Sequence, residues 1–172
     1  GTPTDKADVT RVRFRVLRRG QHPLLYLPAS PACAARALAL YPAQSAKARL
    51  ARKLLGLALR LGISPLRERE ELNVAANEPF AIFLAECAGA SELPPLAILA
   101  GNPHAPGRRF VVLVFNVRGQ PATVIKAGTT EAARQLVMRE ADLLATVPAG
   151  TPGVPRLKAA FQVHGVQAFA LD

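Results

Sequence analysis

The sequence has no tryptophan, two cysteines and three histidines, and only 5% of its 172 residues are aromatic. Cys33 and Cys87 lie in separate alanine-rich segments without CxxC spacing, so they form neither a disulfide framework nor a zinc site. We expect two small buried thiols in a reducing cytoplasm, and a single bridge between them is the alternative. His22, His104 and His164 lie far apart beside turn residues, which predicts no metal site.

Long apolar runs are also absent. The best candidates, residues 54–63 and 80–90, fall short of the roughly 18 apolar residues that span a bilayer, and each contains a charged residue. Neither a transmembrane segment nor a secretory signal is predicted. The chain begins at Gly1 rather than Met and ends at Asp172 within an apolar strand, so we expect a piece of a longer protein.

Acidic residues are scarce in the first part of the chain. Residues 1–70 hold 14 basic residues against 4 acidic ones, whereas residues 71–172 hold 8 of each. The whole net charge of +10 therefore belongs to the first 70 residues. Such an asymmetry indicates a separate role, or an acidic contact, for the basic part.

The basic part predicts a hairpin followed by helices. Apolar and basic residues alternate over positions 11–16, which is typical of a strand with one apolar and one basic face. A turn at 20–23 and a returning strand at 24–27 complete the hairpin. Capping residues, prolines and apolar periodicity predict three helices, at 31–41, 44–61 and 78–88.

The second of these helices is amphipathic and basic. Leu50, Leu54, Leu57 and Leu61 recur at helical spacing, and the basic residues fall largely on the other side. We expect the apolar faces of these helices to pack against the second half of the chain. The basic side is either a solvated face or a surface that meets nucleic acid, anionic lipid or an acidic partner. The shortage of aromatic residues argues against nucleic acid.

The second part of the chain, residues 93–172, has the pattern of strands around one helix. Strands are predicted at 96–100, 110–116, 122–126, 156–162 and 166–171, with a helix at 130–147. The first three strands form an antiparallel meander and the last two a hairpin. The sequence therefore predicts an α+β protein with a basic extension, residues 1–92, and a second domain, residues 93–172.

Glu140 is the most informative position in the predicted helix, because it falls in the middle of an apolar stripe. A carboxylate on a core-facing stripe is costly unless something pairs it. Lys126 ends the third strand of this part, and an ion pair between strand and helix would satisfy both residues. The alternative is that Glu140 lies at the edge of the stripe and reaches water.

These elements in this order resemble a known family. A strand, a glycine-bounded loop, a strand, a turn, a strand with Val-Ile-Lys, a helix with an inward Glu and a hairpin are similar to the N-terminal lobe of the protein-kinase-like superfamily. The aminoglycoside phosphotransferase branch, including its bacterial members, is the most similar. The resemblance covers residues 96–172. It implies a small lobe with a five-stranded antiparallel sheet plus one helix, preceded by the hairpin and about three helices.

The resemblance also implies roles for five residues. Lys126 matches the lysine that holds the α- and β-phosphates of ATP, and Glu140 matches the glutamate that positions it. Val124 matches the apolar residue that lies against adenine. Gly101 and Gly107 bound the loop that would cover the nucleotide.

The loop departs from the family pattern. It is G-x5-G rather than G-x-G-x-x-G, and Pro103 and Pro106 have no N–H to offer a phosphate. Arg108 and Arg109 follow the loop and are candidates to compensate, with a solvated pair as the alternative.

The expected function follows from the resemblance. We expect the nucleotide-binding N-terminal portion of a bacterial kinase-like phosphotransferase, which transfers the γ-phosphoryl group of ATP to a small molecule. The catalytic residues, the Mg²⁺ ligands and the acceptor site would lie on a C-terminal lobe beyond this chain, so none is assigned here and the chain alone is expected to be inactive. A degenerate kinase-like binding or regulatory module, with the basic half on an acidic partner, is the alternative. A basic nucleic-acid-associated protein is the third and least favoured.

Overall fold

The structure is a computed structural model that describes residues 9–63, 65–66, 68–163 and 165–172. The strands are β1 (Val9–Arg19), β2 (His22–Pro28), β3 (Arg69–Ala75), β4 (Leu96–Ala100), β5 (Arg109–Phe115), β6 (Pro121–Gly128), β7 (Leu157–Val163) and β8 (Val166–Leu171). The helices are α1 (Pro31–Ala37), α2 (Ala46–Arg60), α3 (Pro79–Ala88) and α4 (Glu131–Thr146), and a short 3-10 helix, η1 (Leu38–Leu40), follows α1.

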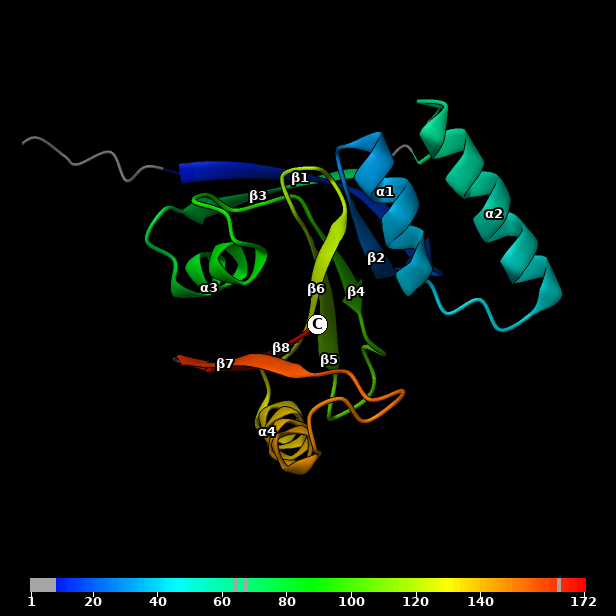
Figure 1. The fold of residues 1–172 in the computed structure, drawn as a ribbon. Helices are drawn as coiled ribbons and strands as arrows, with labels where there is room; N and C mark the ends of the chain where they lie inside the picture. Colours follow the sequence, from blue (N-terminus) through cyan, green and yellow to red (C-terminus); the bar gives the residue numbers. More distant parts are fainter. Residues whose placement is uncertain (1–8, 64, 67, 164) are drawn as a thin grey trace, which may run out of the picture.

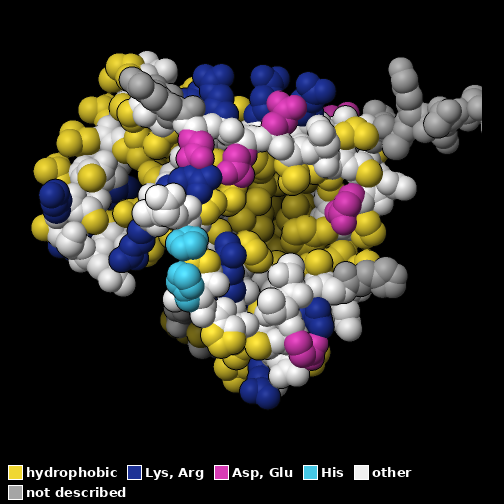
Figure 2. Space-filling model, turned by 180° about the vertical axis from the view of Figure 1, so that it is seen from behind, with side chains coloured by type: hydrophobic (Ala, Val, Ile, Leu, Met, Phe, Trp, Pro, Cys, Tyr) yellow, Lys and Arg dark blue, Asp and Glu magenta, His cyan; other side chains and the backbone are white. Residues whose placement is uncertain are grey.

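The eight strands form one antiparallel sheet in the order β3-β1-β2-β4-β5-β6-β8-β7. The sheet bends so strongly that β1 and β3 lie opposite β7, with α3 inside the bend (Figure 1). The inner face therefore surrounds α3, while α1, α2 and α4 lie outside it. Between these elements the inner face is hollowed and lined by hydrophobic side chains (Figure 2).

The two largest apolar clusters lie on opposite faces of the sheet. On the inner face, Phe83 and Leu84 of α3 pack with Phe14 of β1 and Val112 of β5. The buried residues of the outer cluster come from α1, η1, α2 and three strands, β2, β4 and β5, and the largest are Leu25, Leu27, Leu38, Leu59, Leu113 and Phe115. Each cluster joins residues of the first and second halves of the chain.

The α+β class is correct, but the predicted sheet is wrong. The described residues form a single eight-stranded sheet with four α-helices, not a five-stranded sheet with one helix that follows a separate hairpin and about three helices. The hairpin joins the sheet because β2 pairs with β4, with Leu25 opposite Leu99 and Tyr26 opposite Ile98. An uncovered edge of β4 would leave backbone N–H and C=O groups without partners, and β2 supplies them.

Strand β3 was not predicted, because Arg69, Glu70 and Glu71 begin it with charges instead of an apolar alternation. Its partner β1 stabilises it from outside the segment. Arg11 Nε lies 3.0 Å from Glu71 Oε1, and Arg18 Nε lies 2.7 Å from a carboxylate oxygen of Glu68, just before the strand. Opposite charges on neighbouring strands thus replace the local β-propensity that the sequence lacks.

The prediction that the leucines of α2 pack against the rest of the chain is also wrong. Leu50, Leu54, Leu57 and Leu61 are 59%, 59%, 55% and 67% exposed. The helix instead turns its opposite side to the protein, where Leu59 is fully buried.

Both cysteines are free and buried, as predicted. Across the described ranges, no helix has the length and apolar character needed to cross a bilayer.

Candidate functional site

The strand register places two cations on the same side of the sheet. Val111 of β5 lies opposite Lys126 of β6, and Arg109 lies opposite Gly128. Because side chains alternate along a strand, Arg109 and Lys126 both project from the outer face, as does Val124. This is the face that α4 crosses, since Phe169, the β8 partner of Lys126, packs with Val137 of α4.

Helix α4 carries Glu140 to these cations. Thr130 caps the helix by accepting a hydrogen bond from the N–H of Ala133 at 3.3 Å. Ala133 and Val137 are fully buried against the sheet, which fixes the rotation of the helix about its axis. Gly128 permits this close contact, because a Cβ at that position would lie 2.6 Å from the backbone carbon of Ala133. Glu140, about one turn beyond Val137, therefore lies at the edge of the buried face.

Glu140 holds both cations at once. The ammonium of Lys126 donates to Oε1 of Glu140, and Nη1 of Arg109 donates to Oε2 at 2.9 Å. The side chains of Lys126, Glu140 and Arg109 are 29%, 27% and 42% exposed, so the cluster is half-buried but open to solvent. The predicted Lys126–Glu140 ion pair is confirmed. Two positive charges share one carboxylate, which leaves one net positive charge where an anion can approach.

The two arginines after the loop separate onto opposite faces of the sheet. Arg109 joins Glu140 on the outer face, with its side chain 42% exposed. The guanidinium carbon of Arg108 instead lies 5.0 Å from the ring centre of Phe110, which is a cation–π distance. The Nε atom of Arg108 is buried without a hydrogen-bond partner among the described residues.

The packing of the loop requires glycine at position 101 and brings Gly107 against a side chain of α4. The N–H of Gly101 donates to the carbonyl of Arg109 at 3.2 Å, and a Cβ on Gly101 would lie 2.5 Å from that oxygen. A Cβ on Gly107 would lie 2.5 Å from Cδ1 of Leu136, one turn before Glu140 on α4. The hydroxyl of Thr130 donates to the carbonyl of Pro106 at 3.2 Å. The 101–107 loop thus packs against β5 and α4, beside the cluster of Lys126, Glu140 and Arg109.

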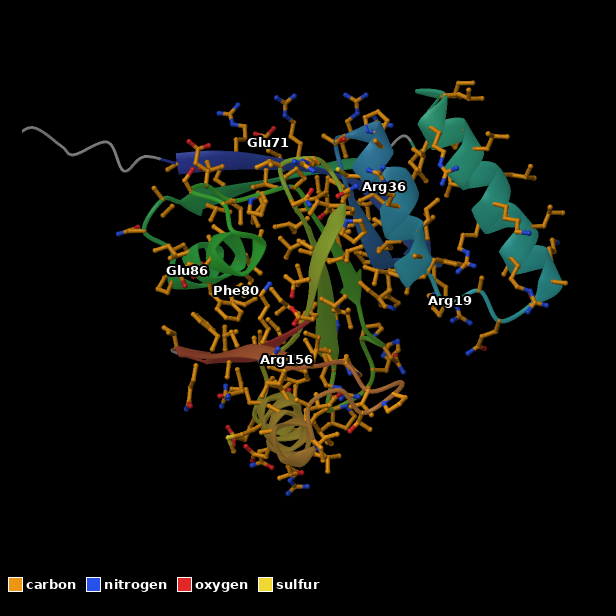
Figure 3. All side chains as sticks on the ribbon, viewed as in Figure 1. Arg19, Arg36, Glu71, Phe80, Glu86 and Arg156 are labelled. Carbon is orange, nitrogen blue, oxygen red and sulfur yellow. The ribbon has the colours of Figure 1, made fainter. Side chains whose placement is uncertain are left out.

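Val124 lies on the same face of β6 as Lys126, two residues closer to the β5–β6 turn. It is half-buried and packs against the outer cluster, to which Cys33 of α1 belongs. Arg36 of α1, labelled in Figure 3, donates to the carbonyl of Gly119 in the β5–β6 turn. Helix α1 therefore covers the turn end of β6, and α4 covers the Lys126 end.

A cavity of about 560 Å³ lies between the loop and the β1–β2 hairpin. Gly101 and His104 line it from the loop, and Arg19 and His22 line it from the β1–β2 hairpin. The rings of His22 and His104 are perpendicular, with centres 5.1 Å apart. Sequence reasoning missed this pair, because only the β2–β4 pairing brings the two residues together.

No family model matches the chain, and neither a curated protein nor a solved structure matches it. The assignment of the candidate site therefore depends on the geometry of its residues alone. The structure gathers Lys126, Glu140, Gly101 and Gly107 around the loop end of β4, β5 and β6, with Val124 two residues along β6. Their roles toward a nucleotide stay predictions.

Proposed function

We propose that this chain binds the phosphates of ATP and is the nucleotide-binding portion of a phosphotransferase that acts on a small molecule. The observation that carries the proposal is the cluster in which Glu140 lies between Lys126 and Arg109. It combines a fixed lysine, a carboxylate that positions it and a second cation, beside a loop bounded by two glycines.

The chemistry of these groups fits a triphosphate. A nucleoside triphosphate presents several negative oxygens, and a half-buried ammonium attracts them more strongly than one in bulk water. The guanidinium of Arg109 offers two parallel N–H donors, a geometry that matches a phosphate. Glu140 prevents the two cations from repelling each other before the nucleotide arrives.

Each residue has a separate role in this proposal. Lys126 and Arg109 donate to phosphate oxygens, Glu140 orients both, Val124 contacts the base and the 101–107 loop covers the phosphates. ATP supplies the γ-phosphoryl group. The groups that activate the acceptor and hold Mg²⁺ belong to a C-terminal lobe, so this chain alone binds nucleotide without transferring phosphate. The two free, buried thiols support a reducing, cytoplasmic compartment.

Calorimetry of ATP·Mg binding tests the proposal. We expect Lys126→Ala to weaken binding by at least about tenfold, because a charge-assisted hydrogen bond is lost. Lys158→Ala is a matched control. Lys158 is 38% exposed and has a carboxylate partner, Asp172 at 3.7 Å, but it lies on β7, outside the charged cluster. Equal affinity of the wild type and Lys126→Ala would remove Lys126 from the site, and no binding by the wild type would contradict the proposal.

A further inference from the structure

Helix α2 carries an uncovered apolar surface. We define its leucine face as Leu50, Leu54, Leu57 and Leu61, each more than half exposed. Leu61 is the C-cap of the helix, and Ile63, two residues later, is 62% exposed. At about 100° per residue, the four leucines fall within an arc of about 60°. They therefore form one stripe, not scattered surface residues.

The attachment of α2 to the protein explains why this stripe is free. The opposite side of the helix packs on α1, with Leu59 fully buried and Leu55 half-buried. Gly56 approaches Leu38, since a Cβ there would lie 3.6 Å from Cδ1 of Leu38. Helix α2 is the outermost element on its side, and its side chains extend outward away from α1 (Figures 1 and 3).

The charge on α2 is of one sign. The helix contains five basic residues and no acidic one: Lys47, Arg49, Arg52, Lys53 and Arg60. Arg52 turns inward and donates to the carbonyl of Tyr41 at 3.3 Å. On the helical wheel, Lys47 lies beyond one edge of the leucine face, and Arg49, Lys53 and Arg60 lie beyond the other.

We propose that the leucine face of α2 docks onto an anionic lipid surface. An amphipathic helix with leucines on one side and flanking Lys and Arg lies in the interface of a bilayer, where the leucines enter the acyl boundary. The long basic stems reach up to the headgroup phosphates, and each cation near the surface adds attraction. Hydrophobic and basic side chains cover the edge of the molecule that α2 forms (Figure 2).

The same features argue against two other occupants. A second copy placed on the leucine face would bring the basic flanks of two helices together without an acidic residue on either α2 to offset them. A nucleic acid would contact the cations but leave the leucines in water, and α2 has no aromatic residue on which a base could stack. Anionic lipid uses the apolar stripe and the charge together.

Vesicle flotation with the 172-residue chain tests the proposal, using phosphatidylcholine vesicles with and without phosphatidylserine. We expect binding to the vesicles with phosphatidylserine only. Leu54→Glu should reduce that binding by at least about tenfold, and the double variant Lys53→Gln/Arg60→Gln by about thirtyfold. Leu50→Glu repeats the apolar test, and far-UV circular dichroism checks the fold of each variant.

Leu143→Glu is the matched control, because Leu143 is an equally exposed leucine on a helix, at 65%, but α4 carries two basic and three acidic residues. Its binding should equal that of the wild type. Three results would overturn the proposal. They are no binding to either vesicle, binding that Leu54→Glu and Leu50→Glu leave unchanged, and a wild-type dimer in sedimentation that Leu54→Glu converts to a monomer without any vesicle binding.

Discussion

Helices α2 and α4 have nearly the same length and opposite surroundings. Both show apolar residues at helical spacing, and both begin with a hydroxyl cap, Ser45 for α2 and Thr130 for α4. Helix α4 lies on the sheet and buries Ala133 and Val137 completely. Helix α2 lies on the seven-residue helix α1 and buries only Leu59 completely.

The contrast between the two helices shows what the spacing of apolar residues along a helix can and cannot predict. Periodicity tells which residues share a face, but the cover of that face depends on a partner elsewhere in the chain. The sheet is wide enough to cover α4, and the two cations on it hold Glu140 at the edge of the contact. Helix α1 covers only a narrow strip of α2, so the leucine face stays outside.

The largest expected effect separates the buried strip of α2 from its leucine face. Leu59→Ala should lower the free energy of unfolding by about 3 kcal/mol, because it removes a fully buried side chain and leaves a cavity. Leu57→Ala, the same change at a leucine that is 55% exposed, should alter it by less than about 0.5 kcal/mol. Urea denaturation measures both. Similar losses in the two variants would mean that α2 packs through its leucine face.

A smaller effect concerns the glycines that set how closely each helix approaches its neighbour. Gly128→Ala should lower the free energy of unfolding by about 2 kcal/mol, since the added Cβ meets the backbone of α4. Urea denaturation again provides the measurement.

The matched control for this change is Gly56→Ala in α2. There the added Cβ makes an ordinary contact, and replacing a glycine inside a helix should raise the free energy of unfolding by about 0.5–1 kcal/mol. A gain in stability for Gly128→Ala would show that α4 does not need the close approach.

The smallest effect concerns the start of α4. A hydrogen bond from Arg134, and then one from Gln135, holds the pKa of the Glu131 carboxyl below its ordinary value of 4.5. A carboxyl with a lowered pKa stabilises the folded state above its ordinary pKa, and this stability is lost as the pH falls through the lowered pKa. The difference in melting temperature between wild type and Glu131→Gln, measured by thermal denaturation at several pH values, should therefore shrink as the solution is acidified from neutral pH.

Ser45→Ala at the start of α2 is the control for that measurement, because a hydroxyl does not titrate and no acidic residue lies in the first turn of α2. Its effect on the melting temperature should be nearly independent of pH. A Glu131→Gln difference that stays constant down to acidic pH would contradict the assigned pairing.

The elements of the second half could be predicted from the sequence because their signals are local. β4 and β8 begin and end at the expected residues, and α4 differs by one residue at each end. The β2–β4 pairing and β3 could not be predicted, because each depends on a partner strand far along the chain. The exposure of the leucine face of α2 could not be predicted either, because it depends on the elements that pack against the helix.

The candidate site divides in the same way. The Lys126–Glu140 pair was predictable, because a carboxylate within an apolar stripe demands a cation nearby. The sequence offered Arg109 as a phosphate donor or as one of a solvated pair of arginines, and not as a partner of Glu140. Its bond to Glu140 depends on the β5–β6 register, which places Arg109 and Lys126 on one face. Local sequence does not contain that register.

The pairing of β2 with β4 has a consequence for folding kinetics. Its paired residues, Leu25 and Leu99, come from opposite halves of the chain. Closing so long a loop is entropically costly and slow, whereas the β4–β5–β6 meander and the β7–β8 hairpin close short ones. The second half should therefore form early and offer the edge of β4 as a template, onto which β2 adds together with α1, α2 and β3. Folding of the basic half would then be limited by how quickly that edge becomes available.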